Sequence, residues 1–484
     1  MRFLYSSILI AAVAAGGAGA AEHQFSTLFT AQDVRDRLSN AEGVATAVDW
    51  CKKTGIGKVY IESFRDGYRA ERPALLHAKQ TFTDAGFAVS GCVTTTGIGK
   101  RSNGWKATSC YTNAGTQKEL QSVFEYAASL FDEIMIDDFW FTDCTCAECE
   151  AARGARSWKD YRCDLMVRLS RERVLGAAKR VNPKVRLIIK YPQWYDRFHE
   201  RGYEVVRETA DFDRIWVGTE TRDRSLGGEQ PYEAYFIMRW LGRLGGDKTG
   251  GGWYDPLKTT ERTYIEQARQ TVLGGARESM LFCYGALQRN DGPADILALR
   301  ANQAELREVA REVQRREVAG IAAYKPPNSH PENESYIFDS VGMLGLPLVP
   351  CHEFPTDAQA AFFSIHALKD PDFATKLSRF AAAGKPVLIT EGLASKLHVE
   401  ADNVRVLHGD SKSLLRLSPE ELNSLRKPLL RPWKIEFHAP NQVALYLFAD
   451  RSWVIENFND TEAHVELDAE KLTVPARGWL YRWR

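Results

Sequence analysis

Short apolar runs alternate with amphipathic stretches between residues 25 and 284. Near-continuous apolar runs are typical of buried parallel strands, and stretches with a 3.6-residue period are typical of the helices that cover them. Eight such runs are predicted strands: Phe25–Phe29, Lys58–Ser63, Ala88–Thr94, Glu133–Phe139, Val185–Tyr191, Arg214–Thr219, Gly251–Tyr254 and Glu278–Tyr284. Helices between them, the first over Ala31–Lys53, complete an α/β fold, a (β/α)8 TIM barrel over residues 21–317.

An open, doubly wound sheet is the alternative arrangement of the same elements. Dinucleotide-binding sheets of that kind carry Gly-x-Gly-x-x-Gly after the first strand, and nucleotide-phosphate loops carry a Walker motif. Neither motif occurs at such a position in this sequence. We therefore favour the barrel and expect no organic cofactor.

The pattern changes after the barrel. Residues 318–396 predict a second, smaller α/β domain, with strands at Gly320–Tyr324, Ser335–Phe338, Pro347–Val349 and Lys385–Thr390. Residues 397–484 predict a C-terminal antiparallel β domain, with strands at Val404–Leu407, Val443–Phe448, Trp453–Phe458, Ala463–Leu467 and Leu480–Trp483.

Residues 1–20 have the pattern of a secretory signal peptide. Arg2 precedes the apolar run Ile8–Ala15, and small residues follow at Ala18–Ala20. The run is shorter than the ~20 residues that span a bilayer, and no later apolar segment reaches that length. We expect an exported protein, periplasmic or extracellular, without a membrane span; a buried N-terminal helix is the alternative.

The composition narrows the class of partner. The chain has 484 residues, of which 44% are hydrophobic and 26% charged, so a disordered protein is excluded. Its 63 Lys and Arg balance 63 Asp and Glu, whereas nucleic-acid binders usually show a basic excess. We expect no nucleic-acid partner.

Candidate chemistry lies at the carboxyl ends of the predicted strands, where barrel enzymes place their active sites. Asp137 and Asp138 end the fourth strand, directly after Ile134–Ile136. Neighbouring residues of a strand point to opposite faces, so we expect one carboxylate at the barrel mouth and the other in its surroundings. Burial and like-charge crowding would raise one pKa and give a proton donor beside an ionised partner. A helix cap or an ion pair is the structural alternative.

Glycoside hydrolysis needs a second carboxylate, and two candidates exist. Glu220 ends the sixth strand and Asp255 the seventh. Glu220 could instead pair with Arg222, and Asp255, which precedes Pro256, could instead begin a turn.

Other residues at the strand ends could bind a sugar through aromatic faces and polar groups. The predicted set is Glu62, Arg65, Trp140, Lys190, Tyr191, Trp194, Arg222, Trp253 and Tyr284. Packing at the barrel rim is the alternative role for the aromatic residues. The expected substrate is an oligo- or polysaccharide.

Nine cysteines are scattered along the chain, and only Cys144, Cys146 and Cys149 are clustered. Thiolates at this spacing can bind one Zn²⁺, and Cys110, after the third strand, is the best-placed fourth ligand. The expected cofactor is a structural zinc ion. A disulfide within the cluster is the alternative in an oxidising compartment.

The layout resembles clan A glycoside hydrolases, most closely the family 42 β-galactosidases. The resemblance implies a barrel, a flavodoxin-like trimerisation domain and a small β domain, and therefore a homo-oligomer formed through the second domain. It matches Asp138 to the acid/base, Cys144, Cys146 and Cys149 to a zinc loop, and Cys110 to the earlier ligand. The family has Asn-Glu where this chain has Asp137–Asp138, and a strand-seven Glu where only Asp255 is near.

A second mapping is to barrels of the α-galactosidase type. It makes Asp138 the nucleophile and Glu220 the acid. The functional prediction is an exported glycoside hydrolase that cleaves an O-glycosidic bond by carboxylate catalysis. A non-catalytic carbohydrate-binding barrel and an assembly protein are the alternatives.

Overall fold

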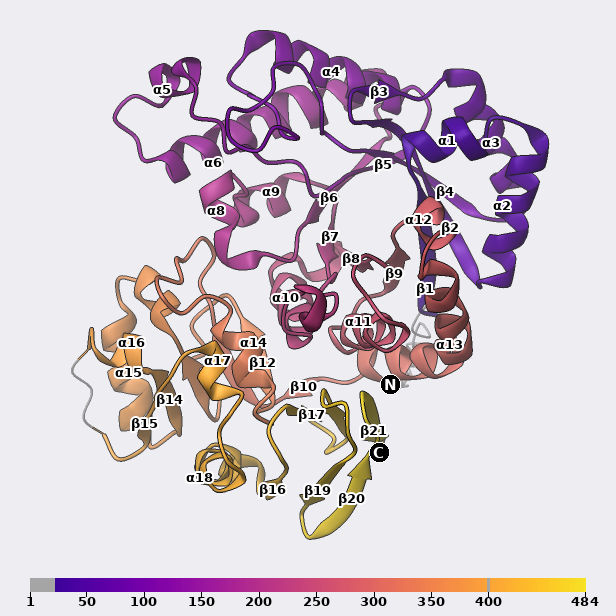
Figure 1. Cartoon of the computed structure of the whole chain (residues 1–484). Helices are drawn as coiled ribbons and strands as arrows, with labels where there is room; N and C mark the ends of the chain where they lie inside the picture. The colour runs from indigo at the N-terminus through magenta and orange to yellow at the C-terminus, as the bar shows by residue number, and fades with distance from the viewer. Residues whose placement is uncertain (1–21, 398–400) are drawn as a thin grey trace, which may run out of the picture.

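A computed structural model describes residues 22–397 and 401–484 of the chain (Figure 1). The predicted signal peptide lies outside the described residues. Within them, no helix is long and apolar enough to cross a membrane.

The first domain is a closed barrel of eight parallel strands. They are β1 (Gln24–Phe29), β2 (Ile56–Arg65), β4 (Ala88–Val93), β5 (Glu133–Ile136), β6 (Arg186–Tyr191), β7 (Arg214–Gly218), β8 (Thr249–Tyr254) and β9 (Glu278–Leu281). The ring closes because β1 pairs with both β2 and β9. Strand β3 (Tyr68–Arg69) only forms a short hairpin with β2. The predicted barrel is confirmed.

Helices surround this ring (Figure 1). They are α1 (Ala31–Arg37), α2 (Ala41–Lys53), α3 (Arg72–Asp84), α4 (Ala114–Ala128), α5 (Ala147–Arg153), α6 (Trp158–Leu169), α7 (Gly176–Val181), α8 (Phe198–Arg201), α9 (Val205–Asp211), α10 (Tyr232–Gly245), α11 (Glu261–Leu273), α12 (Tyr284–Leu287) and α13 (Gly292–Gln314). The single helix predicted over Ala31–Lys53 is two helices, because Asn40 caps a new one through Gly43 N.

The barrel interior is filled by side chains rather than hollow. Every strand contributes one residue to an interior apolar cluster, called the apolar layer below: Leu28, Tyr60, Cys92, Met135, Ile188, Trp216, Trp253 and Met280. Strand β8 fits beside this layer because it contains three consecutive glycines. A Cβ on Gly250 would lie 1.9 Å from the Trp216 ring. The glycines that weaken the strand pattern in the sequence are thus required by the packing of the core.

The second domain is a five-stranded parallel sheet with flavodoxin-like order. Its strands run β12-β11-β13-β14-β15, which is 2-1-3-4-5 in chain order. They are β11 (Ile321–Tyr324), β12 (Leu348–Cys351), β13 (Ala361–Phe363), β14 (Val387–Thr390) and β15 (Val404–Leu407), with helices α14 (Ile337–Gly342), α15 (Phe373–Ala382) and α16 (Glu391–Ala394).

Two sequence predictions for this region differ from the structure. Val404–Leu407, expected in the β domain, pairs in parallel with β14 and is the fifth strand of the second sheet. Ser335–Phe338, expected as a strand, leads into α14 instead. Both segments are short, and long-range packing decides their conformation.

The C-terminal domain contains two antiparallel sheets that share an apolar core. Helices α17 (Ser411–Leu414) and α18 (Pro419–Leu430) lead into it. One sheet joins β10 (Val318–Ala319), β17 (Val443–Phe448), β18 (Trp453–Asn457) and β21 (Gly478–Arg482); the other joins β16 (Phe437–His438), β19 (Ala463–Leu467) and β20 (Glu470–Val474). Because β10 precedes the second domain in the chain, the C-terminal domain contains residues from before and after the second domain.

Candidate active site

A cluster of charged side chains lies at the carboxyl ends of the barrel strands, above the apolar layer. Side chains two residues beyond that layer point to the same interior, because strand residues alternate between faces. This periodicity places Glu62, Thr94, Asp137 and Lys190 on the inward face. Asp138, Glu220, Arg222 and Asp255 follow the ends of their strands.

Lys190 binds two carboxylates at once. Its Nζ lies 2.6 Å from Asp138 Oδ2 and 2.8 Å from Glu220 Oε1. The Lys190 side chain has no exposed surface, and the Trp253 ring packs against it, with its centroid 4.4 Å from Nζ. A buried cation thus links the ends of β5 and β7.

A second network surrounds Asp137. Arg65 donates to Glu62 Oε2 at 2.8 Å and to Asp137 Oδ2 at 2.9 Å. Thr94 Oγ1 contacts Glu62 Oε1 at 2.5 Å and Asp137 Oδ2 at 2.7 Å. Because one hydroxyl has one proton, both contacts are hydrogen bonds when one carboxyl is protonated. Burial, followed by the charge of Asp138, raises the pKa of Asp137 well above its usual range, which assigns that proton to Asp137.

The two carboxylates on Lys190 have different proton affinities. Burial alone would raise the pKa of Asp138, but Lys190, with Asp137 and Arg65 adding to its effect, lowers it to about 2. Burial raises the pKa of Glu220 to about 7, because Asp138 and Asp255 offset much of the effect of Lys190. Glu220 Oε2 is buried and has no hydrogen-bond partner among the described residues. Near neutral pH the site therefore holds an ionised Asp138 beside a Glu220 that can donate a proton.

Asp255 is already paired. Arg222 donates to its two carboxylate oxygens at 2.8 and 3.3 Å, and the Leu257 amide donates to Oδ1. The Asp255 side chain is 5% exposed, whereas that of Asp138 is 17% exposed. Asp138 is thus the more accessible carboxylate, and the structure gives Asp255 the ion-pair role that the sequence left open for Glu220.

The predicted aromatic residues divide into two groups. Trp253 lies in the site and stacks on Phe282, and the half-buried Trp194 packs on Phe141 near Arg201. The structure places the other three outside the site. Trp140 donates to Ser170, Tyr191 contacts Thr209, and Tyr284 packs on Phe29 and Trp50.

The sequence reasoning missed one aromatic group beside Asp138. Trp105, in the loop between β4 and α4, packs against Phe139 and stacks on Phe141 at 5.9 Å. It is 46% exposed, which is unusual for a tryptophan. Asp143 holds this loop by accepting from the Trp105 amide. A tryptophan within a long loop of small polar residues was the available signal.

The four clustered cysteines converge between the loops after β4 and β5. The sulfur atoms of Cys110, Cys144, Cys146 and Cys149 all lie within 4.8 Å of one another. Cys110 Sγ is 3.7 Å from Cys146 Sγ and 3.5 Å from Cys149 Sγ, much farther than the ~2.05 Å of a disulfide bond. The group can hold a metal ion, and the structure brings together the four residues that the sequence selected.

Comparison with known proteins identifies the barrel. A family model described as "Probable glycosyl hydrolase, catalytic domain" matches residues 14–319, more than half of the chain. The chain belongs to this family. The expected relation to clan A glycoside hydrolases is thereby confirmed.

Two relatives add detail. An uncharacterized protein of Saccharolobus solfataricus is 26% identical over an alignment of 347 positions that covers 64% of this chain and 57% of that protein. The match therefore spans less than two thirds of the relative. The α-L-fucosidase isoenzyme 2 from Paenibacillus thiaminolyticus has a TM-score of 0.64, with 95% of this chain and 98% of the fucosidase covered at 10% identity. At that identity the likeness shows a shared fold.

The Lys190 bridge predicts a measurable coupling. Lys190→Met leaves Asp138 and Glu220 facing each other without a cation, which should cost about 3–5 kcal/mol of unfolding free energy at pH 7. Adding Asp138→Asn removes the repulsion and should recover part of that loss. Urea denaturation of the two single variants and the double variant measures the coupling. Equal stability of Lys190→Met and the double variant would contradict the bridge.

Proposed function

We propose that this protein is a retaining glycosidase in which Asp138 is the nucleophile and Glu220 the general acid/base. The observation that carries the proposal is the shared contact of both carboxylates with Lys190, combined with their opposite pKa shifts. Pairs of titratable groups whose surroundings separate their pKa values commonly mark the acid and the base of an active site.

The proposed reaction has two steps. The ionised Asp138 attacks the anomeric carbon while Glu220 gives its proton to the leaving oxygen, so the glycosidic C–O bond breaks and a glycosyl ester forms. Glu220, now ionised, then takes a proton from water. The resulting hydroxide attacks the anomeric carbon and displaces Asp138, which regenerates both groups.

The separation of the carboxylates supports retention of configuration. Because Asp138 Oδ2 and Glu220 Oε1 contact the same nitrogen at 2.6 and 2.8 Å, they are no farther apart than the sum of these distances. This upper limit is below the ~6.5–9.5 Å that leaves room for water in inverting enzymes, and it is compatible with the ~5–5.5 Å of retaining ones.

The roles follow the α-galactosidase-type mapping rather than the family 42 mapping. A general acid must carry a proton at the working pH, and the lowered pKa of Asp138 opposes that role. The exposed Trp105 packs against Phe139, which directly follows Asp138, and this aromatic surface suits an oligo- or polysaccharide substrate. The signal pattern of residues 1–20 supports action outside the cytoplasm.

We also propose that Cys110, Cys144, Cys146 and Cys149 bind a structural zinc ion. Tetrahedral coordination with Zn–S bonds of about 2.3 Å places the sulfur atoms about 3.8 Å apart. The observed separation of Cys146 Sγ and Cys149 Sγ is 3.8 Å. Four thiolates would close the coordination shell, so the ion would hold together the loops that carry Trp105 and Asp138.

Azide rescue tests the two catalytic roles. Asp138→Ala and Glu220→Ala should each lower turnover of an aryl glycoside by at least about 10²-fold. Azide that replaces Asp138 attacks from the free face and should give a glycosyl azide of inverted configuration. Azide that replaces the base role of Glu220 should give the retained configuration. NMR of the products reads the difference.

Asp137→Asn is the matched control, because an amide resembles the protonated Asp137 in shape. It should keep part of the activity and show no azide rescue. The opposite stereochemistry in the two alanine variants would assign the acid/base role to Asp138. Sugar binding without turnover by the unaltered protein would favour the non-catalytic barrel.

The pH profile tests Glu220 directly. Because the acid must be protonated, kcat/KM for a poor leaving group should fall as the pH rises through about 7, the pKa of Glu220. Glu220→Gln should show no such basic limb in its residual activity, and it should keep far more of its activity on a dinitrophenyl glycoside, which needs no proton at its leaving group, than on the poor leaving group. The exposed Glu172→Gln should keep the limb, and a limb that persists in Glu220→Gln would assign it to another group.

Metal analysis tests the zinc proposal. Protein purified without chelator should contain about one equivalent of zinc, and Cys146→Ser should lose most of it because one ligand of four is removed. Cys163→Ala, a buried cysteine outside the cluster, should retain the full content. Metal-free protein with a mapped disulfide among Cys144, Cys146 and Cys149 would overturn the proposal.

A further inference from the structure

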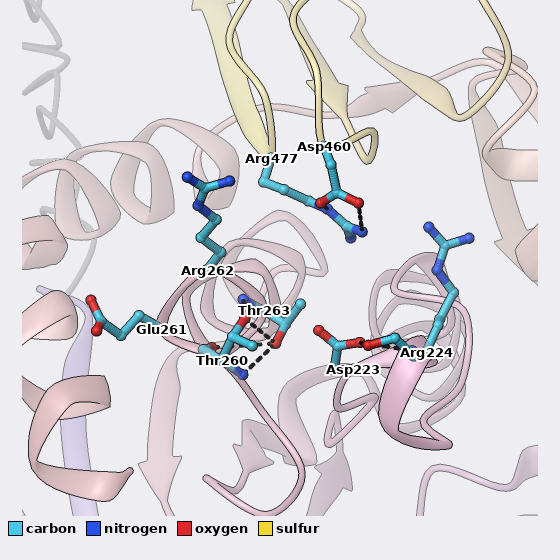
Figure 2. A pocket seen from close by; sticks show the side chains of 9 residues that line it. Asp223, Arg224, Thr260, Glu261, Arg262, Thr263, Asp460 and Arg477 are labelled. Atoms are coloured by element: carbon cyan, nitrogen blue, oxygen red, sulfur yellow. Dashed lines mark hydrogen bonds and ion pairs between the residues drawn. The ribbon is translucent and has the colours of Figure 1, made fainter.

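A separate pocket of about 650 Å³ lies where the barrel meets the C-terminal β domain (Figure 2). Asp223 and Arg224, in the loop after β7, form one wall. The beginning of α11, with its capping residue Thr260, forms another. Asp460 and Arg477, from the C-terminal β domain, line the opposite part of the pocket.

The chemistry of the walls indicates the class of ligand. The nine lining residues are three acids, three arginines and three hydroxyl residues: Asp223, Glu261, Asp460, Arg224, Arg262, Arg477, Ser225, Thr260 and Thr263. The formal charges cancel, so an ion gains little net attraction. An apolar ligand finds no apolar side chain among them. The walls thus offer both hydrogen-bond donors and acceptors, which suit a neutral ligand with many hydroxyl groups.

Several of these groups retain unused hydrogen-bonding capacity. The Arg262 side chain is exposed and forms no hydrogen bond or ion pair with other described residues. Arg224 uses only Nη1, which donates to the side-chain oxygens of Gln230 and Gln442. Asp223 accepts from Ser225 through Oδ1 alone. Two guanidinium groups and a carboxylate oxygen are therefore available to a ligand.

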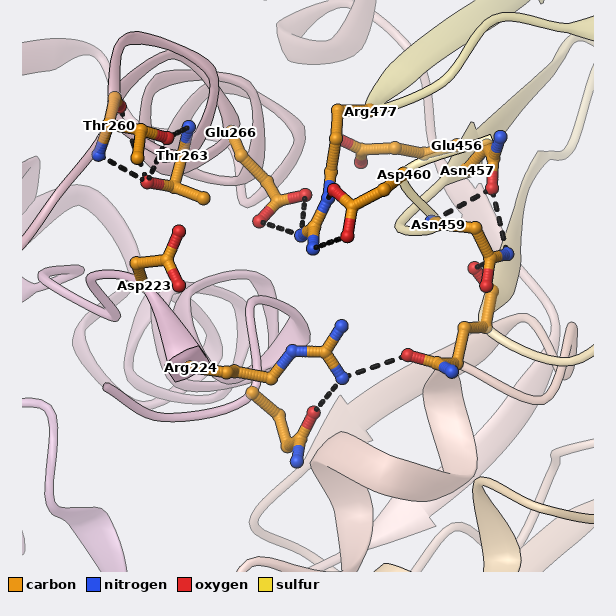
Figure 3. A network of polar contacts seen from close by, with 12 residues as sticks. Asp223, Arg224, Thr260, Thr263, Glu266, Glu456, Asn457, Asn459, Asp460 and Arg477 are labelled. Atoms are coloured by element: carbon orange, nitrogen blue, oxygen red, sulfur yellow. Dashed lines mark hydrogen bonds and ion pairs between the residues drawn. The ribbon is translucent and has the colours of Figure 1, made fainter. Parts of the chain in front are cut away.

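The back of the pocket is held by a network that joins the two domains (Figure 3). Arg477 pairs with Asp460 at 2.8 Å and with the buried Glu266 of α11 at 3.3 Å. Arg269 Nη1 donates to the Arg477 carbonyl. Because these contacts already hold the wall in place, binding a ligand would order fewer side chains and so cost less entropy.

The loops that line the pocket also carry residues of the candidate active site. Asp223 is three residues from Glu220, and three residues span at most about 11 Å. Thr260 is five residues beyond Asp255 on the next barrel loop. A saccharide whose scissile bond lies at Asp138 and Glu220 could therefore place a sugar unit in the pocket that is only a few sugars away from that bond.

We propose that this junction pocket binds a remote, neutral sugar unit of the same glycan that the active site cleaves. The inference rests on the proposed glycosidase activity. The pocket would hold the hydroxyl groups of that unit through Arg262, Arg224 and Asp223, and so favour oligosaccharides over short glycosides.

Two variants that preserve the fold test the pocket. Arg262→Ala removes an exposed side chain, and Asp223→Asn removes a charge but keeps the turn at Ser225. The probes are neutral gluco-, manno-, xylo- and galacto-oligosaccharides, from tetra- to hexasaccharides, and the matching nitrophenyl monosaccharides. Each variant should raise KM for the cleaved oligosaccharide about tenfold, as the loss of a charged hydrogen bond implies, and leave kcat/KM for the monosaccharide within about twofold.

Arg168→Ala, an exposed arginine of α6, is the matched control and should change neither value. Calorimetric titration of the same oligosaccharides into the Asp138→Asn protein measures binding apart from turnover. If Arg262→Ala weakens binding, the pocket proposal is supported, even when no probe is cleaved. Absence of cleavage would overturn the glycosidase proposal alone. Equal effects on both substrate lengths, no effect on either, or no oligosaccharide binding would overturn the pocket.

Discussion

A buried lysine between two carboxylates is the interaction on which the site depends. Moving the Lys190 ammonium out of water is costly unless opposite charges surround it. Asp138 and Glu220 provide those charges at 2.6 and 2.8 Å, and the face of Trp253 lies 4.4 Å away. Strands β5, β6 and β7 must therefore end at matching heights in the barrel, so that their three charged side chains can meet.

The remaining charges balance within the same small volume. Arg65 is held by Glu62 and Asp137, and Arg222 by Asp255. Five carboxyl groups thus face three cations, an excess of two negative charges if all are ionised. The raised pKa values of Asp137 and Glu220 reduce that excess by protonation. The overall neutrality of the chain says nothing about this local arrangement, which arises only when the strand ends meet.

The sequence predicted the barrel and the charged cluster at its strand ends for the same reason. Apolar runs that end in charged residues predict buried strands with chemistry at their tips, and Asp138, Lys190 and Glu220 follow that pattern. The wrong prediction for Tyr191 and the missed Trp105 have physical causes too. Lys190 and Tyr191 are neighbours on β6, so alternation allows only one of them to face the interior. This alternation could have excluded Tyr191 from the sequence alone. The place of the exposed Trp105 could not be predicted in this way, because Asp143 and the cysteine cluster, which lie mostly far along the chain, position its loop.

Lys190 cannot by itself make the pKa values of Asp138 and Glu220 differ, because its contacts with the two carboxylates are nearly equal in length. The difference must come from what stands behind each one. Asp138 has Asp137 and Arg65 nearby: a hydrogen bond from the Asp137 carboxyl and, more weakly, the positive charge of Arg65 both lower the pKa of Asp138. Glu220 has the negative charges of Asp138 and Asp255 on its side, which favour the protonated form. The proposed roles of nucleophile and acid therefore depend on the neighbouring strands: β2 supplies a cation near Asp138, and the end of β8 supplies a carboxylate near Glu220.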